Sequence, residues 1–444
     1  MKIEIIGYLS IPIIIWLTYK YDLKKIMFMT LILSTLSATA IVNVTVLGFS
    51  LTIGQFSGML FILKTLYLAV KDKINYKIVL NKSLIIFMII ATISLTFPII
   101  FSKGVIVLTP DDTYAEIKFS FQMITQFAYL CLGFITLICS VITCNNFKVT
   151  KDDFINSGKI IIYIYIVLVV LQMIVPLEVY NCIFRAAHFS GNQWLPGDIL
   201  RLTGPTSEAS IFAFTCMPII AVVLFDAIES HKFKCSIAPL SLLILVALTK
   251  SSTFLVSLAL IIIMAMIYVI KNFDLINTIK ASNIKIKIIL SVGGIVITLA
   301  FLLIFKDTII ILVNKLIGVG ESGQARTNAL IHHLKVFIRY PFTGVGFGTV
   351  RSYDLLSMWL ASIGGIGMGA IAIYIATLIL GMMKKKENVI FSIYLIIVVT
   401  NLLISIPEPY YLFIWISIGI MQFNYKSNQD INIESVNENL KYCM

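Results

Sequence analysis

The sequence predicts an all-α, polytopic integral membrane protein with about 12–13 transmembrane helices and two long extracytoplasmic loops. Three observations support this fold class. The 444 residues are 59% hydrophobic and only 13% charged, with a mean hydropathy of +0.98. Apolar runs long enough to cross a bilayer recur throughout residues 1–424, which form a single transmembrane domain. Lysines gather in every second connection between these runs, as expected of a multi-pass protein.

Each expected span is an apolar run bounded by polar or charged residues. A break is expected at Pro407-Glu408-Pro409, since proline removes a helical donor and clashes with the preceding turn. Residues 425–444 form a short polar tail. The expected spans are residues 4–19, 26–48, 51–70, 83–102, 119–143, 159–177, 209–227, 236–249, 252–270, 288–305, 356–382, 389–406 and 410–422.

The lysines orient these spans. They mark the odd-numbered connections, which the positive-inside rule places in the cytoplasm together with the tail. The protein is therefore expected in the cytoplasmic (inner) membrane, with its amino terminus outside. The lysines are spread over short loops, so the net charge of +12 reflects orientation and does not indicate a nucleic-acid partner. They include Lys20, Lys24, Lys25, Lys71, Lys73, Lys77, Lys82, Lys148, Lys151, Lys159, Lys232, Lys234, Lys271, Lys280, Lys285, Lys287, Lys384, Lys385 and Lys386.

The two long loops, 178–208 and 306–355, fall outside the cell in this topology and contain all five arginines. Loops of this length are usually functional or disordered, and both contain too many aromatic and aliphatic residues for disorder. Arginine presents a planar, permanently charged fork that matches phosphate and carboxylate groups. Because topology does not require positive charge on this side, the arginines indicate recognition of an anionic group beside the membrane. They are Arg185, Arg201, Arg326, Arg339 and Arg351.

The second loop contains an expected amphipathic helix. Apolar residues recur at 330, 334, 337 and 338, while Lys335 and Arg339 lie four residues apart. This spacing is typical of a helix that lies at a membrane surface.

Four stretches in and after the loops form a recognisable order. The first loop ends in Arg201-Leu-Thr-Gly-Pro-Thr-Ser-Glu208, directly before an apolar span. Arg326 opens the amphipathic helix, Pro341-Phe-Thr-Gly-Val-Gly-Phe-Gly348 follows it, and Gly364-Gly-Ile-Gly367 lies in the next span. In these features, over 201–210 and 326–368, the chain resembles the O-antigen polymerase and ligase superfamily of Wzy and WaaL type.

The resemblance implies glycosyl transfer from an undecaprenyl-pyrophosphate sugar donor at the outer face of the cytoplasmic membrane, without a metal or another cofactor. Loop arginines would hold the pyrophosphate: Arg201 matches the first family arginine, Arg326 the second and Arg339 a weaker third. Ligases of this superfamily carry a histidine shortly after the glycine turn, where this chain reads Arg351-Ser-Tyr-Asp354. We therefore expect a polymerase of surface polysaccharide (O-antigen, capsule or exopolysaccharide). Its donor and acceptor would be lipid-linked oligosaccharide repeat units, and a chain-length regulator and a flippase are further expected partners.

The acceptor hydroxyl requires a general base within reach. Glu208 ranks first by its place in the motif. His332, His333 and Asp354 are alternatives, and the two histidines point about 100° apart on a helix, so at most one faces the site.

For several further residues the sequence allows either a role in substrate binding or a purely structural role. Arg351 is assigned to substrate or to lipid headgroups. Gly344 and Gly346 form either a plain turn or a nest of amides that binds an anion. Arg185 is expected to cover apolar surface with its stem. Glu408 is either a structural cap or an acceptor-site residue.

The sequence leaves three other functions open. A ligase would transfer finished polymer to a different acceptor. A flippase for lipid-linked sugar would carry charge near the centres of its spans and an inverted repeat, neither of which is evident in the sequence. A non-enzymatic assembly or sensor protein is the third. The seven cysteines show no metal-ligand spacing and suggest no disulfide framework.

Overall fold

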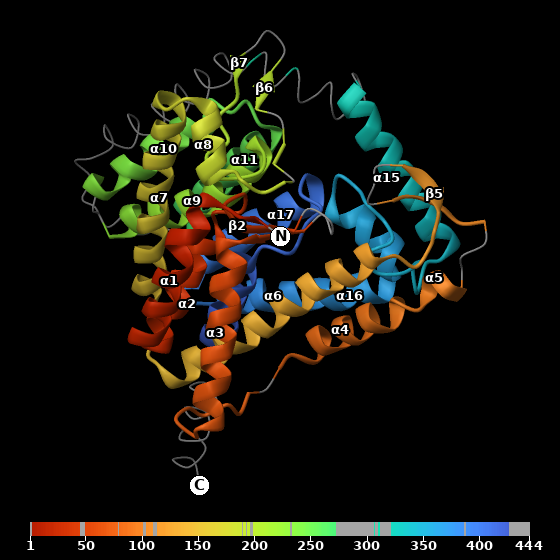
Figure 1. The fold of residues 1–444 in the computed structure, drawn as a ribbon, viewed down its shortest axis with the longest axis horizontal. Helices are drawn as coiled ribbons and strands as arrows, with labels where there is room; N and C mark the ends of the chain where they lie inside the picture. The colour runs from red at the N-terminus through yellow and green to blue at the C-terminus, as the bar shows by residue number, and fades with distance from the viewer. Residues whose placement is uncertain are drawn as a thin grey trace.

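Most of the described chain is α-helical, with small antiparallel sheets among the helices (Figure 1). The expected span 288–305 and residues 426–444 of the tail lie outside the described residues. The computed structural model describes residues 2–44, 49–78, 80–100, 104–109, 113–188, 190–191, 193–195, 199–230, 233–271, 306, 310, 321–385 and 388–425.

Helices begin close to where the apolar runs predict them. Several start at a side-chain cap: Thr52 and Thr150 form capping boxes with Gln55 and Asp153. The helices are α1 (Ile5–Lys20), α2 (Leu23–Ser34), α3 (Ile53–Val70), α4 (Lys82–Ser94), α5 (Phe97–Ile100), α6 (Phe121–Asn146), α7 (Lys151–Ile174), α8 (Leu177–Phe184), α9 (Ala209–Glu229), α10 (Ile237–Ala247), α11 (Ser252–Lys271), α15 (Glu321–Arg339), α16 (Leu355–Met383), α17 (Val389–Ile404) and a last helix, Leu412–Tyr425.

Six of the described helices are long and apolar enough to cross a membrane: α3, the α4–α5 stretch, α6, α7, α9 and α16. Apolar helices of 10–17 residues accompany them at Ile5–Lys20, Lys234–Ala247, Ser252–Ile267, Val389–Ile404 and Leu412–Tyr425. The mostly helical chain is thus confirmed, and its long apolar helices are compatible with a polytopic membrane protein, whereas the number of about 12–13 crossings stays a prediction.

The all-α prediction was wrong at 26–48, which is not one span. Helix α2 ends at Ser34, and strands β2 (Ala40–Val44) and β3 (Phe49–Thr52) form a hairpin to which β1 (Lys2–Ile3) adds. The run is apolar enough for a span, but it is rich in β-branched residues such as Ile41 and Val42, which favour strands. Two more hairpins lie in the loops: β4 (Ile106–Leu108) with β5 (Tyr114–Glu116), and β6 (Trp194–Leu195) with β7 (Ile199–Leu200).

Helix α9 forms the centre of the molecule. Of its apolar stretch 83% is buried, compared with 56% or less in the other five long helices. It packs against α7, α10, α11 and α17, while α16 packs against α4, α15 and α17. The amino-terminal end of α9 is therefore a fixed point around which the loops are arranged.

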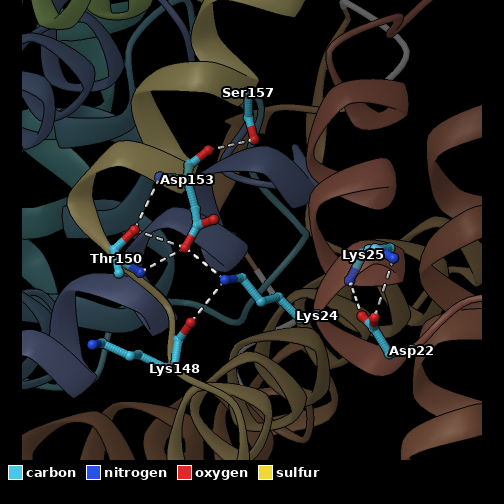
Figure 2. A network of polar contacts seen from close by, with 7 residues as sticks. All are labelled: Asp22, Lys24, Lys25, Lys148, Thr150, Asp153 and Ser157. Atoms are coloured by element: carbon cyan, nitrogen blue, oxygen red, sulfur yellow. Dashed lines mark hydrogen bonds and ion pairs between the residues drawn. The ribbon is translucent and has the colours of Figure 1, made fainter.

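The lysine-rich connections meet at one end of the bundle. Lys24, at the start of α2, lies 2.7 Å from Asp153 and donates to the Lys148 carbonyl at 2.7 Å, as Figure 2 shows. Lys151 pairs with Glu229 at 2.8 Å. These contacts join the first, fifth and seventh connections, so the predicted one-sidedness of these lysines agrees with the fold. Which face of a membrane this end occupies stays a prediction.

Helix α16 is interrupted at Gly364, whose φ of 67° and ψ of −175° are not helical. The interruption exposes the carbonyls of Ala361 and Ser362, and these accept hydrogen bonds of 2.9 Å each from the amides of Val345 and Gly346. Gly365 returns a bond of 2.7 Å to the Pro341 carbonyl. The predicted glycine turn is thus fastened into a broken helix.

Candidate functional site

A polar cavity of about 380 Å³ lies at the end of the helices opposite to the lysines. Helices α3, α6 and α9 each approach the lysine end at one terminus and carry cavity residues toward the other, and helices of this length extend about 27–39 Å. Loop residues from distant parts of the chain complete the wall. The lining residues are Ser34, Ser37, Ser50, Thr52, Gly54, Gln55, Gln126, Tyr129, His188, Ser207, Glu208, Ile211, Val350, Arg351, Met358, Pro407, Glu408, Tyr410, Tyr411 and Leu412.

Glu208 enters the cavity at the amino terminus of α9. It occupies the N-cap position in an extended backbone conformation, and its exposed side chain accepts a hydrogen bond of 3.1 Å from Ser210. A negative charge at this point is favoured by the helix dipole. The expected first-ranked base therefore lies in the cavity.

Arg185 fixes the backbone that leads to Glu208. Its buried guanidinium donates to the Thr206 carbonyl at 2.8 Å, to the Ser207 carbonyl at 2.6 Å and to the Gly191 carbonyl at 3.1 Å. Burial lowers the pKa of Arg185 to about 10, which still leaves it charged at neutral pH. The prediction that Arg185 merely covers apolar surface was wrong, because its polar head is used fully to hold this loop.

Glu408 brings a second carboxylate to the same cavity. Tyr411 donates to its Oε2 at 3.1 Å, and the neighbouring Pro409 carbonyl is held by Trp415 at 2.8 Å. The side chain is accessible to water yet surrounded by protein, as expected for a residue on a cavity wall. Burial raises its pKa, the Tyr411 hydrogen bond and Arg351 oppose this, and Glu208 adds to it. The structure therefore places Glu408 on the cavity wall and not at a helix cap.

Arg351 is the arginine of the cavity wall. Its backbone amide donates to the Leu108 carbonyl at 2.8 Å, which joins the segment to strand β4. Its charge acts on Glu408, so the cavity contains a cation together with two carboxylates.

Arg201 and Arg326 lie beside the cavity without lining it. Arg201 donates to the Thr249 carbonyl at 3.2 Å, and burial lowers its pKa, with the charge of Glu208 opposing and that of Arg326 adding to the shift. Arg326 stacks on Tyr353 at 5.6 Å. Within the described part of the chain, neither arginine forms an ion pair with a carboxylate. Two like charges are thus held near each other, which suits a shared anion.

The two candidate histidines are not on the cavity wall. His332 shares a hydrogen bond of 2.8 Å with the Ile106 carbonyl and packs edge-on against Tyr114. His333 is fully buried, and burial followed by the charge of His332 lowers its pKa to about 4. His332 therefore attaches α15 to the β4–β5 hairpin, and neither residue is placed to act as the base.

The glycine turn shows packing and not an anion nest. Gly344 and Gly346 have φ values of 65° and 123°. A Cβ at Gly344 would lie 2.4 Å from the Ser362 backbone, and one at Gly346 would lie 2.7 Å from Pro98. The Gly344 amide donates to the Tyr340 carbonyl at 3.1 Å, and the Gly346 amide is the one that bonds to α16. These amides are used within the protein, so the prediction that they bind substrate loses its basis.

Arg339 and Asp354 also have structural positions. Arg339 is exposed at the end of α15 and lies 5.5 Å over the ring of Tyr340. Asp354 accepts a 2.7 Å bond from the Ser357 amide and so caps α16. Neither belongs to the cavity wall.

Sequence reasoning missed several cavity residues altogether, above all His188, Gln55, Gln126 and Tyr129. These residues could have been found in the sequence as polar side chains near the ends of the expected helices, on the side opposite to the lysines. As for metals, the described residues contain no group of three or more His, Cys, Asp or Glu side chains that could hold an ion.

No protein-family model matches this chain, and no curated protein matches it. The site has therefore to be interpreted from its own geometry.

Proposed function

We propose that this protein is a membrane glycosyltransferase that polymerises undecaprenyl-pyrophosphate-linked repeat units of a surface polysaccharide. The observation that supports this most is the cavity that gathers Glu208, Arg351 and Glu408 from three distant segments, with Arg201 and Arg326 beside it. Transfer of a sugar from a pyrophosphate requires acid–base groups beside cationic groups that bind the pyrophosphate, a role that suits the two arginines.

The cavity has the chemistry of a saccharide site. Amide, hydroxyl and phenol groups exchange hydrogen bonds with sugar hydroxyls, and aromatic rings pack on apolar sugar faces. Gln55, Gln126 and Tyr129 supply such groups. The volume is also within the range of about 300–1,000 Å³ found for small-molecule sites.

In the proposed reaction, Arg201 and Arg326 hold the pyrophosphate of the donor. Glu208 takes the proton of the acceptor hydroxyl as its oxygen bonds to the anomeric carbon. The bond from that carbon to the pyrophosphate oxygen breaks, and its electron pair leaves with the pyrophosphate. Glu408 lies on the same cavity wall, where burial raises its pKa, and its carboxyl group would hydrogen-bond the sugar.

A flippase and a ligase are the competing functions. A flippase is expected to carry charge near the middle of its spans. Here Glu208, Arg351 and Glu408 all lie at helix ends or in loops. The one lysine inside α3, Lys64, turns to the Thr18 carbonyl at 2.6 Å near the lysine end. The positions of these charged side chains thus favour an enzyme that acts at one end of the helices over a flippase that moves its substrate through them.

Reconstitution tests the proposal. Purified protein with lipid-linked repeat units alone should produce a ladder of polymers, also in the presence of a chelator. Transfer of a single repeat to a different acceptor would favour the ligase, and movement of repeats across the bilayer without a ladder would favour the flippase.

Substitutions at the two ends of α9 refine this test. Glu208→Gln removes the base and should reduce the rate about 10²–10⁴-fold. Glu229→Gln, at the opposite end of the same helix and paired with Lys151, is the matched control and should keep the rate. Equal activity of the Glu208 variant and wild type would exclude Glu208 as the base.

A further inference from the structure

Two tyrosines and two glutamines form an uncharged part of the cavity wall to which the reaction above assigns no step. Gln126 and Tyr129 lie one turn apart on α6, Gln55 lies in the first turn of α3, and Tyr410 follows the proline break at 407–409. All four side chains are half-buried. Aromatic rings and amides that are neither sealed in the core nor fully in water suit a ligand with both an apolar face and hydroxyl groups.

The two tyrosine rings form one aromatic surface. Their centroids lie 5.9 Å apart, and the rings are tilted by 36° to each other. Phe49, which does not line the cavity, stacks on Tyr129 with centroids 6.1 Å apart and rings 16° from parallel. Tyr129 is thus held between two aromatic neighbours before a ligand arrives, which lowers the cost of binding. A pyranose ring presents a face of C–H groups that packs on such an aromatic ring.

The phenol group of each tyrosine meets an amide. Tyr410 donates from its hydroxyl to Oε1 of Gln126 at 3.3 Å. Oε1 of Gln55 accepts from the Thr52 amide at 2.9 Å, and the Gln55 side chain is within hydrogen-bond reach of the Tyr129 phenol. The oxygen of each amide is therefore used within the protein, and each amide nitrogen carries two hydrogens. Both glutamines can thus donate to sugar hydroxyls beside the rings.

The tyrosines lie on one side of Glu208 and the arginines on another. The charge of Glu208 acts on Arg201 and also on Glu408. The charge of Glu408 acts in turn on Tyr129 and Tyr410. A path of neighbouring groups thus runs from the arginines through the two carboxylates to the tyrosines. Because the arginines are assigned to the donor pyrophosphate, a sugar on the tyrosines reaches Glu208 from the acceptor side.

We infer that Tyr129 and Tyr410, together with Gln55 and Gln126, form the acceptor subsite, in which a pyranose packs its C–H face on the tyrosine rings while the amides hold its hydroxyls. That this sugar is the acceptor rests on the proposed function, whereas the binding of a pyranose at the tyrosines does not. These side chains bind and orient the sugar, and Glu208 takes the proton of its hydroxyl.

Saturation-transfer NMR tests the subsite without any pyrophosphate. The full-length protein in nanodiscs is mixed with the methyl β-glycosides of glucose, galactose and N-acetylglucosamine, and empty nanodiscs give the background. Ring protons of at least one glycoside should receive saturation from the protein. Tyr129→Phe, which keeps the aromatic ring, should retain most of this signal, and Tyr129→Ala should lose most of it.

Two further variants separate loss of the subsite from a folding defect in Tyr129→Ala. Gln126→Met keeps a side chain of similar length but cannot donate a hydrogen bond, and it should also weaken the signal. Tyr163→Ala, which removes a 59% exposed tyrosine from α7, is the control and should leave the signal unchanged. Wild-type signal in Tyr129→Ala, or no signal from any of the three glycosides with the unchanged protein, would overturn the inference, whatever the protein does to lipid-linked sugars.

Kinetics tests whether the bound sugar is the acceptor. A repeat unit joined to a plain alkyl alcohol can accept but cannot donate, because it lacks the pyrophosphate. Tyr129→Ala should raise KM for this glycoside about tenfold, with KM for the lipid-linked donor unchanged, since one aromatic contact accounts for a difference of this order. A rise in the donor KM alone would move the tyrosines to the donor side and overturn the assignment. Absence of transfer by the unchanged protein would count against the proposed function and leave the NMR result standing.

Discussion

The two ends of this bundle use charge in different ways. At the lysine end, cations face carboxylates: Lys24 with Asp153, Lys151 with Glu229 and Lys159 with Asp226. At the cavity end, Arg185 and Arg201 donate to backbone carbonyls, and Arg326 lies on a tyrosine ring. Paired charges join connections and need no ligand. Arg201 and Arg326 lie near each other and, in the part of the chain that the structure describes, form no ion pair with a carboxylate, which suits an anion from outside the protein.

The largest effect is expected at the arginine pair. Arg201→Ala and Arg326→Ala should each weaken transition-state stabilisation by about 2–4 kcal/mol, since each removes a charged donor from the leaving group. Arg→Lys should rescue poorly, because lysine keeps the charge but lacks the planar fork. The rate of ladder formation at equal protein abundance is the measurement. Arg339→Ala, at an exposed site, is the control. Wild-type rates in both alanine variants would mean that this end is merely structural.

Arg185 should affect stability nearly as strongly. Arg185→Ala leaves three loop carbonyls without their donor in a buried site, at about 1–3 kcal/mol for each unsatisfied group before relaxation. We expect a clear fall in the thermal unfolding midpoint in detergent. A lysine side chain would reach fewer of these carbonyls, so Arg185→Lys should recover only part of the loss. If Arg185→Ala unfolds at the wild-type temperature, the loop that carries Glu208 is held by other contacts.

Glu408 links the cavity to pH. Its pKa is raised in the folded protein, so the neutral form is favoured there. Below the unfolded pKa of about 4.3 both states are protonated and there is no penalty. As pH rises through the raised pKa, the folded protein has to ionise a carboxyl group that it prefers neutral, and stability is lost. Glu408→Gln should thus become more stable relative to wild type as pH increases from about 4 to about 8, followed by unfolding midpoints. A constant difference across this range would contradict a raised pKa.

The smallest effect is expected at the lysine end. Lys24→Gln removes a partly buried pair with Asp153 and should lower the free energy of unfolding by about 1 kcal/mol or less. Lys25→Gln, in a more exposed pair with Asp22, should change it even less. Ladder formation should persist in both, since this end has no assigned role in the reaction. Loss of polymer formation in a stable, abundant Lys24→Gln protein would contradict the assignment of the reaction to the cavity end alone.

Part of the site followed from the sequence. Glu208 was singled out by its place before an apolar span, and the structure puts it on the cavity wall with Arg351. The two candidate histidines lie off that wall, because helical periodicity gives a direction around α15 but not the element that each direction meets. His332 meets β4 and His333 the interior.

Composition, hydropathy and lysine spacing by themselves determined a mostly helical chain with long apolar helices, and with the lysines of its first, fifth and seventh connections at one end, since these features depend on transfer free energies that add along the sequence. Tertiary structure alone decided three things. It divided 26–48 into a helix and a hairpin, broke α16 at Gly364, and joined Glu208, Glu408 and His188 at one cavity. Those outcomes depend on hydrogen bonds and contacts between segments far apart in the sequence. A local sequence pattern does not specify which distant segments will pack against each other.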